Sequence, residues 1–113
     1  MSTSSPKEIA DAYFAAIRAH DVDGIKKLFA PAGELVTSTG TYVGPDAIAD
    51  FYAGQAFAAS DLQPQPGPFV IDGGRIAVEI VLQMYGQNSR VGDFFEIRDG
   101  LIHRLVVYLG GAA

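Results

Sequence analysis

The chain has 113 residues, of which 49% are hydrophobic and 19% are charged, and its formal net charge is −5. This length and balance indicate one folded domain, residues 1–113, and exclude a disordered polar chain. The acidic charge, without a cluster of lysine or arginine, disfavours nucleic acid and anionic membranes as partners. The absence of cysteine excludes disulfides and thiolate chemistry.

Other features disfavour a membrane span, a secretion signal and a metal site. No apolar stretch approaches the roughly 18 residues that a spanning helix needs. Residues 1–5 lack the basic and then apolar pattern of a signal peptide. The two histidines are far apart in the sequence and do not suggest a zinc site. We therefore expect a soluble cytoplasmic protein that needs no metal and no cofactor.

The first half of the chain predicts three helices. Ser5, Pro6 and Glu8 form a helix start, because serine caps, proline fits the first turn and glutamate completes a capping box. A second, short helix begins after Asp21, and a third begins at residues 44–46. The apolar stripe expected for the second helix consists of Val22, Ile25, Leu28 and Phe29.

The segments between and after these helices are predicted to be strands, turns and one loop. The segment at residues 63–68 contains three prolines and a glycine and is expected to be a loop. The expected strands are residues 34–38, 41–43, 69–72, 75–85, 89–98 and 101–109. Helices first and an antiparallel meander afterwards favour an α+β fold, with the N-terminal helices packed on one face of a curved, mostly antiparallel sheet.

Asp93 occupies a position where the pattern calls for an apolar side chain. The segment 91–98 alternates like a half-buried strand, and Asp93 falls on the same face as Val91, Phe95 and Ile97. Burying an unpaired carboxylate is costly, so such a group is paired, neutralised by a raised pKa, or placed in a cavity. The pattern alone equally allows an aspartate that anchors a loop or helix end.

The last hairpin has two possible registers. With a two-residue turn, Asp93 faces Val106. With a three-residue turn that includes Arg98, Asp93 faces Leu105 and Phe95 faces His103, which gives the cleaner apolar face and is our preferred register. His103 would then lie diagonally from Asp93, within reach through long side chains or one water.

The opposite face of the predicted sheet is also rather apolar. It would carry Phe94, Ile102, Val106 and Tyr108, although no helix remains to cover it. A second copy of the chain is the simplest cover, so we expect a homodimer through this outer sheet face.

Three segments together resemble the NTF2-like superfamily, and within it the ketosteroid isomerases and the SnoaL-like polyketide cyclases. They are residues 12–30, 44–52 and 93–102, and they span nearly the whole chain in the same order. The resemblance implies a cone in which helices close a curved sheet over a deep, largely apolar pocket. By position, Tyr13 and Asp93 match the two oxyanion-hole residues of the isomerases.

The resemblance breaks at the isomerases' general base. That position is Thr37, whose hydroxyl is not a base at neutral pH, and the nearest acid, Glu34, belongs to the other strand face. In the SnoaL-like cyclases, one strand aspartate near the position of Asp93 is thought to serve as the acid and base of an aldol closure. The resemblance therefore implies isomerase-like or cyclase-like chemistry without assigning one reaction.

These considerations give one hypothesis with two branches. The chain either acts on a carbonyl group of an apolar ligand, polycyclic ligands included, by enolisation, isomerisation or aldol-type cyclisation, or binds a ligand or assembles without catalysis. The expected catalytic residues are Tyr13, Asp93 and His103. The expected ligand-binding residues are Thr37, Phe51, Tyr52, Met84, Phe95, Leu105 and Val107.

Overall fold

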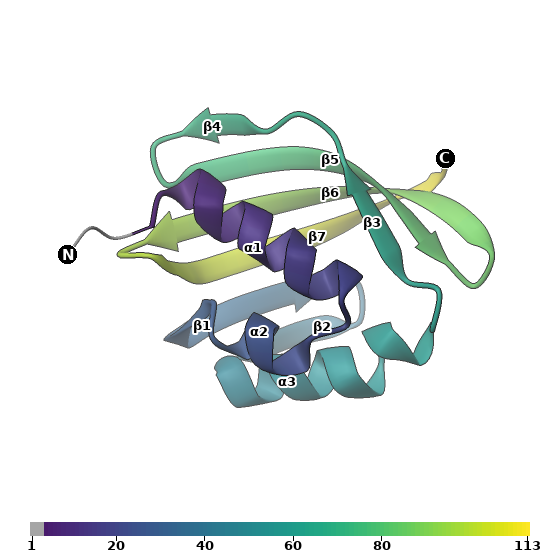
Figure 1. The fold of residues 1–113 in the computed structure, drawn as a ribbon, viewed down its shortest axis with the longest axis horizontal. Coiled ribbons are helices and arrows are strands. Elements are labelled where there is room, and N and C mark those ends of the chain that lie inside the picture. The colour runs from purple at the N-terminus through teal and green to yellow at the C-terminus, as the bar shows by residue number, and fades with distance from the viewer. Residues whose placement is uncertain (1–3) are drawn as a thin grey trace.

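The computed structural model describes residues 4–113 and contains helices packed against one strongly curved sheet (Figure 1). The helical elements are α1 (Pro6–Arg18), α2 (Val22–Lys26), α3 (Pro45–Gly54) and a 3-10 turn, η1 (Ala56–Ala58). The strands are β1 (Phe29–Thr37), β2 (Gly40–Val43), β3 (Gln63–Pro66), β4 (Val70–Asp72), β5 (Arg75–Met84), β6 (Gln87–Arg98) and β7 (Leu101–Ala112). The expected α+β architecture is confirmed.

The sheet has the order β2-β1-β7-β6-β5-β3, and β4 adds a short pairing with β5. Strands β1 and β7 run parallel, whereas the other pairs are antiparallel. Helix α1 crosses the concave face of the long strands, and α3 lies beside β1 and β2 (Figure 1). The helices and the curved strands therefore form two layers, with α1 facing the long strands of the sheet (Figure 1).

The start of α1 follows the expected local chemistry. Ser5 accepts a hydrogen bond from the backbone N–H of Glu8, and the Glu8 side chain accepts one from the N–H of Ser5. This reciprocal pair is the predicted capping box, with Pro6 in the first turn. It fixes the start of the helix that carries Tyr13.

The expected extent of the second helix is wrong. Asp21 caps it as predicted, by accepting from the N–H of Gly24, but α2 ends at Lys26 and Phe29 already belongs to β1. Phe29 is buried and pairs with Ile102 of β7. The long-range strand pairing therefore overrides the helical spacing of the apolar residues.

The expected loop at residues 63–68 is also wrong in part, because Gln63–Pro66 forms strand β3. This strand pairs only with β5 within the described chain and closes the sheet at that edge. Proline lacks a backbone N–H and is tolerated on an edge strand, where one side of the backbone has no partner. Pro64 is buried there and reaches the space under the sheet.

Neither predicted register of the last hairpin is correct along its whole length. The turn has the two residues Asp99 and Gly100, both with positive φ, and Arg98 pairs with Leu101. A bulge then shifts the pairing, so that Phe95 faces Leu105 and Asp93 faces Val107. His103 is the extra residue of this bulge, because Ile97 pairs with Ile102 and Glu96 with Arg104.

The bulge also changes which side chains of β7 are buried. Ile102, expected on the outer face, has no exposed surface and packs in the core, where its N–H donates to the carbonyl of Leu28. Phe94 and Tyr108 are exposed on the outer face as expected, at 51% and 58%. Val106 pairs with Phe94 and borders the same outer hollow, but it is only 3% exposed.

No helix within residues 4–113 is long and apolar enough to cross a bilayer. Over the same residues, no group of three or more His, Cys, Asp or Glu side chains is placed to hold a metal ion.

Candidate functional site

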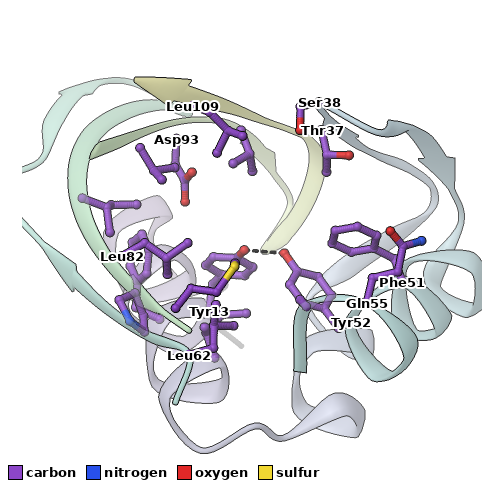
Figure 2. Close-up of a pocket in the computed structure, with 18 of the residues that line it drawn as sticks. Tyr13, Thr37, Ser38, Phe51, Tyr52, Gln55, Leu62, Leu82, Asp93 and Leu109 are labelled. Carbon is purple, nitrogen blue, oxygen red and sulfur yellow. Dashed lines mark hydrogen bonds between the residues drawn. The ribbon is translucent and has the colours of Figure 1, made fainter. Parts of the chain in front are cut away.

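A cavity of about 250 Å³ lies between the helices and the concave face of the sheet (Figure 2). Helix α1 contributes one wall, α3 and η1 a second, and strands β5, β6 and β7 a third. The lining residues are Tyr13, Phe14, Ile17, Thr37, Ser38, Thr39, Phe51, Tyr52, Gln55, Ala56, Leu62, Pro64, Ile80, Leu82, Met84, Val91, Asp93, Val107 and Leu109. Most of this surface is aliphatic or aromatic, as expected for a site that takes an apolar ligand.

Asp93 brings a carboxyl group into this apolar space. It sits in the middle of β6, between Val78 of β5 and Val107 of β7, and its side chain points into the cavity (Figure 2). The residue is 3% exposed, and its Oδ1 has no hydrogen-bond partner within residues 4–113. Burial raises the pKa of Asp93 to about 7, because the apolar surroundings disfavour the charged form. Both protonation states are therefore accessible near neutral pH.

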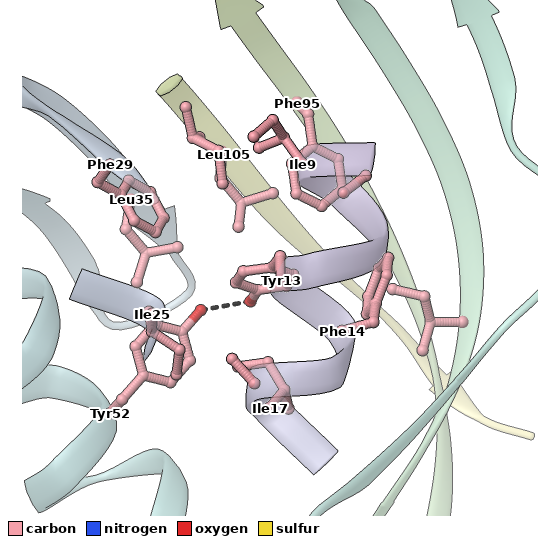
Figure 3. Close-up of a cluster of buried hydrophobic side chains, with 14 of the residues drawn as sticks. Ile9, Tyr13, Phe14, Ile17, Ile25, Phe29, Leu35, Tyr52, Phe95 and Leu105 are labelled. Carbon is pink, nitrogen blue, oxygen red and sulfur yellow. Dashed lines mark hydrogen bonds between the residues drawn. The ribbon is translucent and has the colours of Figure 1, made fainter. Parts of the chain in front are cut away.

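Tyr13 and Tyr52 place two hydroxyl groups on another side of the cavity. Tyr13 comes from α1 and Tyr52 from α3, and the hydroxyls are hydrogen-bonded to each other (Figures 2 and 3). Both residues are 4% exposed. Tyr13 also packs edge-on against Phe95, with 5.4 Å between ring centroids. The buried rings hold the two oxygens in fixed positions.

Burial keeps both phenols protonated. It raises the pKa of Tyr13 well above its usual value, with smaller contributions from the neighbouring Tyr52 and Asp93 groups. Burial likewise raises the pKa of Tyr52. One hydroxyl proton is used in the bond between the tyrosines, so the hydroxyl that accepts this bond keeps its own proton for another acceptor. The pair can therefore donate to a ligand oxygen.

Polar residues also gather at the mouth of the cavity, where Ser38, Thr39 and Gln55 are exposed. The apolar Leu109 is exposed at the same mouth. The hydroxyl of Thr37 is engaged in the β1–β2 turn: Oγ1 accepts from the N–H of Thr39 at 3.2 Å and lies 3.2 Å from the carbonyl oxygen of Gly40. Thr37 lines the cavity, but these contacts direct its oxygen to the turn.

The structure brings most of the predicted site residues together. Tyr13, Thr37, Phe51, Tyr52, Met84, Asp93 and Val107 all line the cavity. Phe95 and Leu105 do not line it, because they lie in the packed core, at 1% and 0% exposure.

The expected pairing of His103 with Asp93 is wrong. Asp93 faces Val107, which is four residues from His103, and four residues of a strand span roughly 13 Å. The imidazole Nδ1 instead lies 3.2 Å from the guanidinium of Arg98, at the hairpin end. His103 has no contact with the cavity.

Sequence patterns did not identify the mouth of the cavity. Ser38 and Thr39 belong to a turn and Gln55 ends α3, so no apolar periodicity marks them. Leu82 and Val91 could have been assigned, because they share the inward parity of Ile80 and Asp93.

A family model described as the SnoaL-like domain matches residues 10–105. The chain belongs to the SnoaL-like domain family. Its fold is that of NTF2-like proteins, as the sequence resemblance implied. No curated protein matches the chain significantly.

Solved structures with this fold include several kinds of protein. One proposed to be a polyketide cyclase, from Sinorhizobium meliloti, is 26% identical, with a TM-score of 0.80 over 89% of this chain and 94% of the other. One proposed to be a ketosteroid isomerase, from Kribbella flavida, is 19% identical, with a TM-score of 0.85 over 98% and 83%. A protein with a ketosteroid isomerase-like fold from Catenulispora acidiphila, in complex with trimethylamine, is 21% identical, with a TM-score of 0.80 over 95% and 86%.

Proposed function

We propose that this SnoaL-like protein is an enzyme that acts on a carbonyl group of a small apolar ligand by enolisation, isomerisation or aldol-type cyclisation. The observation that carries the proposal is the buried carboxyl of Asp93 in the same cavity as the paired hydroxyls of Tyr13 and Tyr52. One group can carry a proton and the other can stabilise an oxyanion, which are the two requirements of enolisation.

Asp93 is the proposed proton carrier. Its carboxylate takes a proton from the carbon next to the carbonyl, the C–H electron pair forms the enolate double bond, and negative charge develops on the ligand oxygen. Return of the proton at another carbon completes an isomerisation, whereas attack of the enolate carbon on a second carbonyl completes an aldol closure. A pKa of about 7 suits this role, because a group that both takes and returns a proton works best near the ambient pH.

The tyrosine pair is the proposed oxyanion donor. A hydroxyl that already accepts a hydrogen bond donates more strongly, because successive hydrogen bonds polarise one another. Both hydroxyls are fixed by buried rings and need no rearrangement when charge develops. The cavity volume is about 250 Å³, whereas pockets that bind drug-sized ligands have roughly 300–1,000 Å³. A ligand of one or two rings therefore fits better than a larger polycycle.

Deuterium exchange at the carbon next to a ketone tests this proposal without the natural substrate. With 2-tetralone in D2O, followed by NMR, we expect exchange above background that rises with pH and levels off above about 7. Asp93→Asn should lower the catalysed rate by about 10² or more, because it keeps the shape but removes the base. Asp99→Asn, which makes the same charge change on the exposed turn, should match the wild type. Equal exchange by the Asp93→Asn variant would contradict the proposed role.

A non-enzymatic ligand-binding or assembly protein is the second candidate. It is favoured by Thr37, since the position that holds the general base in the isomerases carries a hydroxyl engaged in a turn. This candidate predicts that phenols such as 2-naphthol bind in the cavity while no ketone exchanges its protons faster than in buffer.

The homodimer remains a proposal, supported by the exposed Phe94 and Tyr108 on the outer sheet face. Their rings are in edge-on contact, with 5.5 Å between centroids. A charge at the interface would test the dimer, and Phe94 suits this test better than Val106. Val106 is only 3% exposed, so a charge there would also disturb the fold. We expect sedimentation at micromolar concentration to give a dimer for the wild type and a monomer for Phe94→Glu. Tyr85→Glu, at an exposed position on the β5–β6 turn, is the matched control and should remain dimeric.

A further inference from the structure

The ionisable groups of the cavity are unbalanced. Asp93 is the only carboxyl group among the lining residues, and no lysine, arginine or histidine of the described chain lines the cavity with it. The other titratable lining groups are the phenols of Tyr13 and Tyr52, which burial keeps neutral. When Asp93 ionises, the cavity therefore holds one negative charge and no protein cation to neutralise it.

The surroundings of Asp93 leave this charge without a protein partner. The neighbouring strands present Val78 and Val107, and the rest of the wall on β5 consists of Ile80, Leu82 and Met84. Oδ1 has no hydrogen-bond partner among residues 4–113, although it is buried. A buried carboxylate without a partner is unfavourable, and a ligand that donates a charged N–H would relieve this cost.

The remaining walls suit an organic cation. The aromatic rings of Tyr13, Phe14, Phe51 and Tyr52 line the cavity, and a cation close to such a ring face is attracted by its quadrupole. The chain carries a formal net charge of −5, which favours the approach of cations and disfavours anions. The same features disfavour carboxylates and phosphates, because the cavity offers them no cationic side chain.

We propose that the cavity binds protonated apolar amines, with the ammonium N–H donated to the carboxylate of Asp93 and the apolar body packed on the aromatic wall. This ligand class uses the same carboxyl group as the proposed carbonyl chemistry but does not require that chemistry. Both ligand classes use the carboxylate form of Asp93, as a base for the carbonyl ligand and as a hydrogen-bond acceptor for the ammonium.

Calorimetric titration with 2-naphthylmethylamine and its neutral analogue 2-naphthylmethanol tests this proposal. At pH 8.5, we expect the wild type to bind the amine roughly tenfold or more tightly than the alcohol, because a charged hydrogen bond replaces a neutral one. Below about pH 7, the affinity for the amine should fall by roughly tenfold for each pH unit, because the binding-competent carboxylate becomes scarce. The affinity for the alcohol should stay nearly constant.

Two variants identify the responsible charge. Asp93→Asn should bind the amine no more tightly than the alcohol, both at pH 8.5 and below pH 7. Asp99→Asn should behave like the wild type, because it removes a charge outside the cavity. Circular dichroism of Asp93→Asn establishes that the variant is folded. Equal affinity for amine and alcohol in the wild type, a preference for the amine over the alcohol that persists in Asp93→Asn, or no amine binding by the wild type at millimolar concentration would overturn the proposal. Amine binding without ketone exchange would support it and count against the proposed enzyme activity.

Discussion

Asp93→Leu is expected to raise the free energy of unfolding at pH 8 by about 2–4 kcal/mol relative to the wild type. The reason is the cost of an ionised carboxyl that is 3% exposed and has an unpartnered Oδ1. The pKa of Asp93 is raised from 3.8 to about 7 by burial. A shift of this size corresponds to about 4 kcal/mol, and water that enters the cavity reduces it.

The sign of the pH dependence follows from proton binding. Between pH 4 and pH 7, the folded protein holds a proton on Asp93 that the unfolded chain has lost, so this residue makes the folded state less stable as the pH rises. Above pH 7 both states are ionised and the contribution is constant. The advantage of Asp93→Leu over the wild type should therefore shrink on acidification and be about 3 kcal/mol smaller at pH 5 than at pH 8.

Urea unfolding followed by circular dichroism at pH 5 and pH 8 measures this difference. Asp93→Asn is the matched control for charge, because it keeps the shape of the side chain and should lose the same pH dependence. A leucine variant that is less stable than the wild type by about 2 kcal/mol or more at pH 8 would mean that Asp93 anchors the structure.

Short-range patterns predicted the parts of the fold that depend on neighbouring residues. The capping box of α1 and the cap of α2 by Asp21 required only residues within one turn, and both are present. The inward parity of β5 and β6 required only alternation, and it placed Asp93 among the cavity residues. The site residues that follow these periodicities were therefore accessible from the sequence.

Long-range pairing explains the errors. The parallel pairing of Phe29 with Ile102 decides where α2 ends, and it joins residues that are far apart in the chain. The bulge at His103 turns Ile102 inward and also separates His103 from Asp93, so a register argument from turn length alone could not find it. The contact of Tyr13 with Tyr52 joins two helices and has no signature in either segment.

Under the second, non-enzymatic candidate, in which Asp93 moves no proton, Thr37→Asp is expected to raise the isomerisation of a bicyclic β,γ-unsaturated ketone by about 10²-fold over a wild type that barely turns it over. Oxyanion donors stabilise charge, but moving a proton between two carbons needs a group of matched pKa within reach. Thr37 lines the cavity and offers no such group. The variant should fold, because an aspartate oxygen can accept the N–H of Thr39 as Oγ1 of Thr37 does.

The absorbance of the conjugated product measures this reaction, and Thr37→Asn is the control that keeps the turn contact without a base. With the introduced carboxylate as base, Asp93 would act as a proton donor to the oxyanion, so the activity of Thr37→Asp should decline above about pH 7. The wild type should bind 2-naphthol through the protonated Asp93 and the tyrosine hydroxyls. This binding should weaken once Asp93 ionises. Brisk turnover by the wild type would instead support Asp93 as the base of the proposed enzyme. Equal activity of the asparagine and aspartate variants would exclude position 37 from the proton transfer.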